Sequence, residues 1–114
     1  MNPLTDEQTK RLETMSLMGK PVRHKEKGGS RGAPGRVMGK VVDEVYIIVH
    51  DYKHVLHKIE GDFWGGDKYA FRGGYWTYTA DRKNIKWGQF TQFLTQREYK
   101  QLLAKAREKG WDIF

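Results

Sequence analysis

Residues 69–114 read YAFRGGYWTYTADRKNIKWGQFTQFLTQREYKQLLAKAREKGWDIF, an aromatic stretch of strand character that runs into a strong helix signal. Thr95 and Glu98 have the spacing of a capping box, in which each side chain bonds the backbone N–H of the other residue. An apolar stripe at helical spacing follows, made of Tyr99, Leu102, Leu103 and Ala106. The pattern predicts a helix over residues 95–109, which Gly110 ends in the left-handed conformation.

Upstream of that helix, β-rich runs alternate with turn signals. The expected strands are residues 20–23, 36–50, 55–59, 69–79 and 85–90. Both faces of residues 36–50 are largely apolar, which indicates a central strand. Within it we expect a turn at residues 42–44 or a bend at Gly39, and the turn to the next strand falls at residues 51–54.

The N-terminal part repeats the capping-box pattern at Thr5 and Gln8, which predicts a helix over residues 5–17. Residues 25–35, KEKGGSRGAPG, carry glycines and a proline with no large apolar group, as is typical of a mobile loop. The whole chain of residues 1–114 therefore predicts a single α+β domain. We expect a small antiparallel rolled sheet or partly open β-barrel of about five strands, with an N-terminal and a C-terminal helix.

Composition narrows the class of protein. The chain has 114 residues, 38% of them hydrophobic, and no cysteine, which excludes disulfides, thiolate metal sites and cysteine nucleophiles. No apolar run approaches the ~18 residues that a membrane span needs, and no signal-peptide pattern is present. These features predict a cytoplasmic protein with no membrane partner.

The positive charge is concentrated in one segment. The chain carries a net charge of +7, and residues 19–40 hold seven basic side chains against Glu26 alone, a local net charge of +6. A Gly-rich basic loop is suited to following a phosphate chain. The candidate phosphate contacts are Lys20, Arg23, Lys25, Lys27, Arg31 and Arg36. The alternative is that this loop and the basic helix surface are simply solvated.

Aromatic residues make up 13% of the chain, which is a large share for a small core. Exposed rings beside lysine and arginine stack the bases of single-stranded nucleic acid, so Trp64 and Tyr75 are candidate stacking residues. The best hypothesis is therefore a small basic module that binds nucleic acid. A second hypothesis is a protein-interaction or homodimer-forming domain that uses the same aromatic face. A further alternative places all the rings in the core.

The sequence has few residue patterns that are typical of a catalytic or metal site. His50, Asp51, His54 and His57 have zinc-ligand side chains, but His54 is expected in a turn, so surface histidines are the better interpretation. No catalytic triad, phosphate-binding loop or nucleophile elbow is present. We therefore expect no metal, no cofactor and no assigned catalytic residue. A small enzyme with a pocket around His57 on the sheet is the third hypothesis.

The C-terminal stretch also resembles other sequences. The runs YWTY at residues 75–78, WGQFTQFL at residues 87–94 and KGW at residues 109–111 are similar to the ending of short uncharacterised bacterial proteins, some associated with mobile gene cassettes. The resemblance covers residues 69–114. It implies no activity, and no functional residue is carried over from it.

Overall fold

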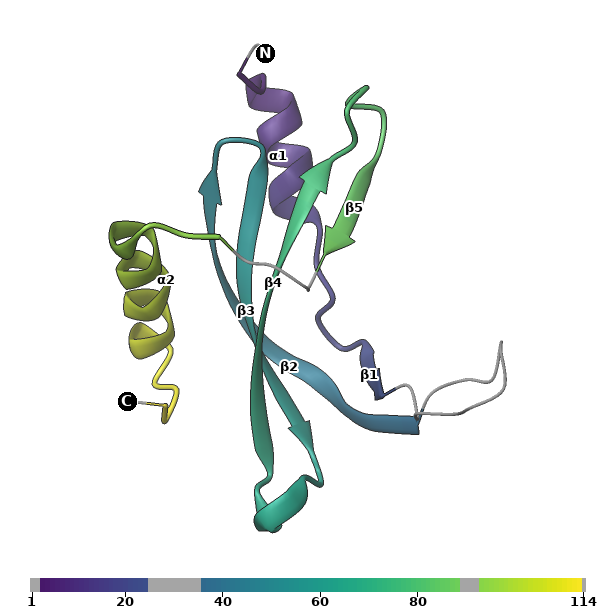
Figure 1. Ribbon diagram of the computed structural model, residues 1–114, viewed down its shortest axis with the longest axis vertical. Helices are drawn as coiled ribbons and strands as arrows, with labels where there is room; N and C mark the ends of the chain where they lie inside the picture. The colour runs from purple at the N-terminus through teal and green to yellow at the C-terminus, as the bar shows by residue number, and fades with distance from the viewer. Residues whose placement is uncertain (1–2, 25–35, 89–92, 114) are drawn as a thin grey trace. The chain divides into compact units, whose positions relative to one another are not determined.

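The computed structural model describes residues 3–24, 36–88 and 93–113, and this part of the chain forms two α-helices and one five-stranded sheet (Figure 1). In chain order the elements are α1 (Asp6–Thr14), β1 (Pro21–His24), β2 (Arg36–Val49), β3 (Tyr52–Gly61), the 3-10 helix η1 (Trp64–Gly66), β4 (Tyr69–Tyr78), β5 (Ile85–Gly88) and α2 (Gln96–Glu108). The strand order follows the chain, β1-β2-β3-β4-β5, with β1 and β5 at the edges of the described sheet. The predicted α+β class, the five antiparallel strands and the two helices are confirmed.

The chain divides into two compact units. The first unit comprises Met1–Ser16, Val45–Leu56 and Gly73–Phe114, and the second comprises Leu17–Glu44 and His57–Arg72. Strands β2, β3 and β4 each contribute one part to each unit.

Helix α2 covers one face of the sheet in the first unit. Its capping box forms as predicted, with the Glu98 N–H donating to Thr95 Oγ1 over 3.2 Å and the Thr95 N–H donating to Glu98 Oε1 over 2.9 Å. The buried cluster beneath the helix consists of Val45, Ile47, Leu56, Leu102, Ala106 and Trp111. At its end Gly110 takes a φ of +77°, and the Trp111 N–H bonds the Ala106 carbonyl over 3.2 Å. The predicted stop is therefore confirmed.

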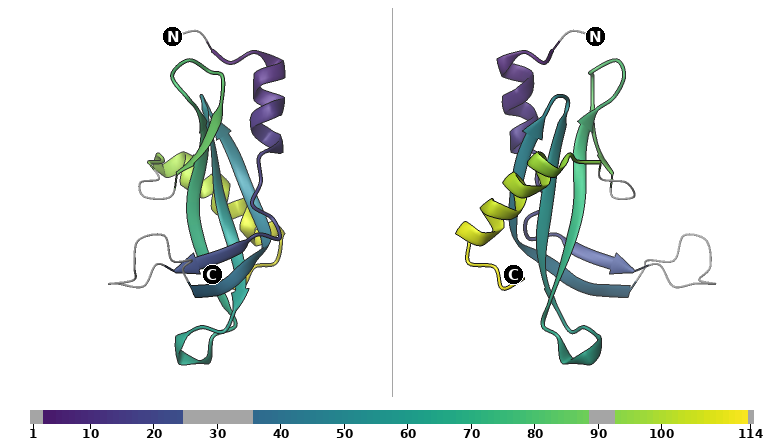
Figure 2. Two further views of the ribbon diagram at one scale, coloured as in Figure 1. Left: turned by 90° about the vertical axis from the view of Figure 1, so that its right-hand side faces the viewer. Right: turned by 60° about the vertical axis from the view of Figure 1, so that its left-hand side comes forward.

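Helix α1 covers the opposite face of the same unit (Figure 2). Alternation along β3 points Leu56 toward α2 and Lys53 toward α1, because successive side chains of a strand leave opposite faces. Leu12 of α1 is fully buried, and the Tyr78 hydroxyl donates to the Gln8 carbonyl over 2.7 Å. A fully buried leucine stabilises the fold by roughly 1.5–3 kcal/mol, so even this short helix is firmly anchored.

Three expectations about boundaries were wrong. Helix α1 ends at Thr14 instead of residue 17, and Met15 is already extended, with ψ at 127°. Strand β2 runs without a turn from Arg36 to Val49. The β2–β3 turn occupies only His50 and Asp51, so residues 52–54 belong to strand β3. A two-residue turn usually contains glycine or asparagine, and the sequence His-Asp lacks that signal.

The second unit is built on the pairing of β1 with β2. Pro21 pairs with Lys40 and Val22 with Gly39, after which the register shifts so that Arg23 faces Val37. The segment before β1 also lies along β2, because the Gly19 N–H bonds the Val41 carbonyl over 2.8 Å. Val41 is 1% exposed as a result. The predicted mobile loop at residues 25–35 lies outside the described residues.

Candidate functional site

The predicted phosphate contacts fall in the second unit. Lys20 precedes β1 and Arg23 lies within it, and both side chains are exposed. Arg36 is the first residue of β2. Lys25, Lys27 and Arg31 lie outside the described residues. The part of this surface that the structure describes is thus the exposed edge formed by Lys20, Arg23 and Lys40 around the β1–β2 pair.

Trp64 projects from the connection between β3 and β4. This connection is a closed loop, because the Gly61 N–H bonds the Lys68 carbonyl and the Phe63 N–H bonds the Asp67 carbonyl, each over 2.9 Å. Gly65 allows the tight course of the loop with a φ of +75°. The Trp64 side chain is 78% exposed, and its ring meets the Phe63 ring edge-on with 6.0 Å between centroids. The loop therefore presents an indole to solvent from a hydrogen-bonded frame.

A second aromatic residue follows the same loop on β4. Tyr69 is 41% exposed, and its ring lies under two ammonium groups, with Lys58 Nζ 4.3 Å and Lys68 Nζ 5.8 Å from the ring centroid. Phe71, two residues further on the same face, is 37% exposed. We call Lys58, Phe63, Trp64, Lys68, Tyr69 and Phe71 the hairpin-tip surface. The sequence pattern indicated Trp64 as a stacking residue but not Tyr69, although Tyr69 lies next to Lys68 in the chain.

The charge of the hairpin tip is mixed. Glu60, Asp62 and Asp67 lie in the same stretch as Lys58 and Lys68, so the tip itself is not basic. The excess of positive charge in the second unit comes from the β1–β2 side. A ligand that contacts both the hairpin tip and the β1–β2 side would place its apolar or aromatic groups at the tip and its negative groups along β1.

Tyr75, the other predicted stacking residue, is half-buried in the first unit. Its ring meets Tyr52 edge-on, with centroids 5.5 Å apart, and lies against Gly88 on β5, where a Cβ would come within 2.5 Å of the Tyr75 ring. The Trp87 ring likewise lies against Gly74, where a Cβ would meet ring atoms of Trp87. Trp76 is 7% exposed. These rings pack against the sheet, in contrast to Trp64.

His54 is buried beside Tyr75. It is 5% exposed, and its ring stacks on Tyr52 with 5.6 Å between centroids and 18° between planes. Burial lowers the pKa of His54 below its ordinary value, and the nearby Glu98 carboxylate opposes that shift. The Nδ1 atom is buried and has no hydrogen-bond partner among the residues that the structure describes. The neutral imidazole is therefore the form that the fold favours.

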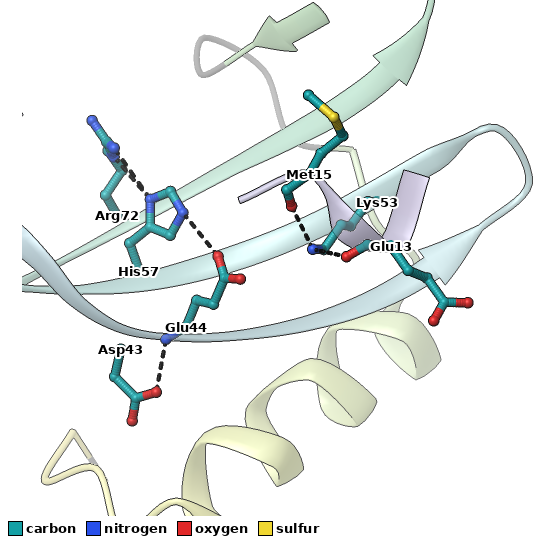
Figure 3. Close-up of polar contacts among 7 residues, drawn as sticks. All are labelled: Glu13, Met15, Asp43, Glu44, Lys53, His57 and Arg72. Carbon is teal, nitrogen blue, oxygen red and sulfur yellow. Dashed lines mark hydrogen bonds and ion pairs between the residues drawn. The ribbon is translucent and has the colours of Figure 1, made fainter. Parts of the chain in front are cut away.

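A polar cluster on three neighbouring strands lies in the second unit (Figure 3). His57 of β3 is fully buried, and its Nδ1 accepts from the Arg72 guanidinium of β4, with Nε at 3.3 Å and Nη2 at 3.2 Å. Because a guanidinium only donates, Nδ1 is the accepting nitrogen in these contacts, and Nε2 lies 3.6 Å from Glu44 Oε2 of β2. Burial lowers the pKa of Arg72 below its ordinary value.

A buried cation lies in the first unit (Figure 3). Lys53 is 1% exposed, and its ammonium donates to the carbonyls of Glu13, over 2.8 Å, and Met15, over 2.6 Å. The ammonium also lies 4.2 Å from the centroid of the Tyr46 ring. The carbonyls at the end of a helix lack internal partners and carry partial negative charge, so the lysine acts as the C-terminal cap of α1. It ties that helix to β3.

Neither buried cluster is open to a substrate. His57 and Lys53 are almost completely excluded from solvent, and their polar atoms contact other protein groups, as expected of groups that hold strands and helices together. The sequence missed both clusters because the expected turn at residues 51–54 placed Lys53 outside the strand and gave no sign that Glu44 lies near His57. Among the described residues, no group of three histidine, aspartate or glutamate side chains could hold a metal ion.

Comparison of the chain with protein-family models, with curated proteins and with solved structures gives no match. The resemblance of residues 69–114 to short bacterial proteins stays a prediction. Neither described helix has the length and apolar character needed to cross a membrane.

Proposed function

We propose that the second unit is a binding module for single-stranded nucleic acid, with the hairpin-tip surface as its stacking site. The observation that carries this proposal is the exposure of Trp64, at 78%, on a loop closed by two backbone hydrogen bonds. Base stacking on an aromatic side chain contributes about 1–3 kcal/mol per base and tolerates any sequence. A ring that is already held in place loses little conformational freedom when a base stacks on it.

Tyr69 provides a second point of contact with a different chemistry. One ammonium lies 4.3 Å from its ring centroid, so a base that stacks nearby brings its phosphate within reach of Lys58 or Lys68. Lys20 and Arg23 at the β1–β2 edge then bind further phosphates of the nucleic-acid strand. Tyr75 was also predicted to stack bases. We leave it out of the proposed interface because its ring packs on Gly88.

A protein partner is the second candidate, and the same observation favours it. Exposed tryptophan and tyrosine residues are enriched at the energetic centres of protein interfaces. The mixed charge of the hairpin tip, with Glu60, Asp62 and Asp67 beside the lysines, suits such a partner better than it suits a polyanion. The two hypotheses differ in their response to salt and in the mass of the protein in solution.

The test is fluorescence anisotropy of a labelled single-stranded oligonucleotide at several salt concentrations. If Lys20, Arg23, Lys58 and Lys68 neutralise about four phosphates, the slope of log affinity against log salt is roughly −3. Trp64→Ala should weaken binding by about 1–3 kcal/mol at every salt concentration. Lys20→Ala and Arg23→Ala should each reduce the steepness of the salt dependence by about 0.7.

Phe93→Ala is the matched control, because Phe93 is 89% exposed and belongs to the first unit. It should bind the oligonucleotide as the unsubstituted protein does. Absence of binding at low salt would refute the nucleic-acid hypothesis. A mass that rises with protein concentration and falls to that of the monomer in Trp64→Ala would instead establish self-association through the hairpin tip.

A further inference from the structure

A groove of about 490 Å³ lies in the first unit. It is lined by residues of the N-terminal segment, the β2–β3 turn and the β4–β5 loop, namely Pro3, Leu4, Thr9, His50, Asp51, Tyr52 and Arg82. Its volume falls in the range of roughly 300–1,000 Å³ that is usual for small-molecule sites, and its lining combines apolar carbon with a few polar groups.

Backbone strain is concentrated at this groove. In the described part of the chain the non-glycine residues with positive φ are His50, at 52°, and Arg82, at 58°, and both line the groove. The left-handed conformation costs roughly 1–3 kcal/mol for such a residue and persists where its surroundings enforce it. At Arg82 a hydrogen bond from its N–H to the Thr79 carbonyl, 2.8 Å long, enforces it. Asp81 Oδ1 adds to this by accepting from the Thr79 hydroxyl over 2.7 Å.

This conformation brings a guanidinium to a carboxylate of a different loop. Arg82 Nη2 lies 3.5 Å from Asp51 Oδ2, and the two side chains are 18% and 28% exposed. A purely anionic ligand would be repelled by Asp51, and a purely cationic one by Arg82. A ligand that carries both charges on neighbouring atoms pairs with both groups at once. Thr9 and Tyr52 also line the groove.

We propose that this groove binds a small zwitterion of the α-amino-acid class. The ligand carboxylate lies against Arg82 and its ammonium against Asp51. Its hydrocarbon side chain covers Pro3 and Leu4, the apolar part of the lining. The strained backbone at His50 and Arg82 is then kept because it positions polar groups for the ligand.

The test is a titration followed by amide NMR of the full chain with three probes of nearly equal carbon skeleton. L-leucine carries both charges, isocaproate only the carboxylate, and isoamylamine only the ammonium. L-leucine should shift the amide signals of His50, Asp51 and Arg82 in a saturable manner. The single-charge probes should bind on the order of tenfold more weakly, because each forms only one of the two ion pairs. No saturable shift with L-leucine, or equal affinity for isocaproate, would overturn the proposal.

Arg82→Gly separates binding from folding. Glycine adopts a positive φ without strain, so the variant should melt at the same or a higher temperature while its affinity for L-leucine falls at least about tenfold. Lys83→Gln, which removes a neighbouring charge that does not line the groove, is the matched control and should retain full affinity. Undiminished affinity in Arg82→Gly would place the ligand elsewhere on the protein and refute the assignment.

Discussion

Replacing Lys53 by methionine tests the role of the buried ammonium at the end of α1. Methionine keeps most of the apolar stem but removes the donor to the carbonyls of Glu13 and Met15, which lie 2.8 Å and 2.6 Å away. A hydrogen bond to a charged group contributes about 1.5–3 kcal/mol, so two bonds set the upper limit of the loss. The variant also avoids the cost of burying a cation, which offsets part of that loss.

The exposure of Glu13 and Met15, whose carbonyls accept these bonds, determines how much unfolding free energy Lys53→Met loses. Glu13 is exposed and Met15 half-buried, so water reaches at least one of the two carbonyls once the ammonium is gone. We therefore expect Lys53→Met to lower the free energy of unfolding by about 2 kcal/mol. The loss should act on α1 first, because the bonds that disappear are those that tie its C-terminal end to β3.

Two measurements check this expectation. Urea denaturation should show a lower midpoint with an unchanged slope, and hydrogen exchange should show faster exchange of the Thr9 amide, whose bond to the Thr5 carbonyl is 2.9 Å long. Lys100→Met, on the exposed surface of α2, is the control and should leave both observables nearly unchanged. Unaltered stability of Lys53→Met would show that the hydrogen bonds of the ammonium and its burial cost cancel, and that Leu12 and the Tyr78–Gln8 hydrogen bond suffice to hold α1.

Three further expectations follow from the first unit. Thr95→Ala removes the side-chain half of the α2 capping box and should lower the free energy of unfolding by about 1 kcal/mol in urea; an unchanged midpoint would contradict the cap. Because burial lowers the pKa of His54 from 6.5, its contribution to stability should be complete above pH 6.5 and decline as the pH falls below it. His54→Phe should flatten that decline when the melting temperature is measured against pH. Gly88→Ala brings a Cβ to 2.5 Å from the Tyr75 ring and should lower the free energy of unfolding in urea by about 1–3 kcal/mol. Adding Tyr75→Ala to this variant should relieve the collision, and simple additivity of the two losses would refute the contact.

The start and stop of α2 could be predicted because their signals are local. Thr95 and Glu98 bond each other's backbone across three residues, and Gly110 needs no partner to adopt a positive φ. The antiparallel order of the strands could also be predicted, because short connections leave consecutive strands few other ways to pair. These features depend on residues that are neighbours in the chain.

The end of α1 and the β2–β3 register depend on the tertiary structure. The apolar pattern after residue 14 carries no stop signal, and the helix ends where Lys53, distant in sequence, takes up its last carbonyls. The His50–Asp51 turn lacks glycine, so the sequence pattern predicts a longer turn at residues 51–54. Only the folded register brings Glu44 and Arg72 to His57.

The number of aromatic residues can be read from the sequence, but their exposure depends on the tertiary structure. The sequence shows that the rings are numerous, but Trp64 and Trp76 look alike in it, because each has an aromatic residue before it and a Gly-Gly pair close by. The structure buries Trp76 to 7% exposure, with the Trp87 ring of β5 5.2 Å from it between centroids. It leaves Trp64 at 78% exposure in a closed loop, where its ring meets that of Phe63. Burial is a property of what other segments pack against a side chain, and for that reason the candidate interface became visible only in the folded chain.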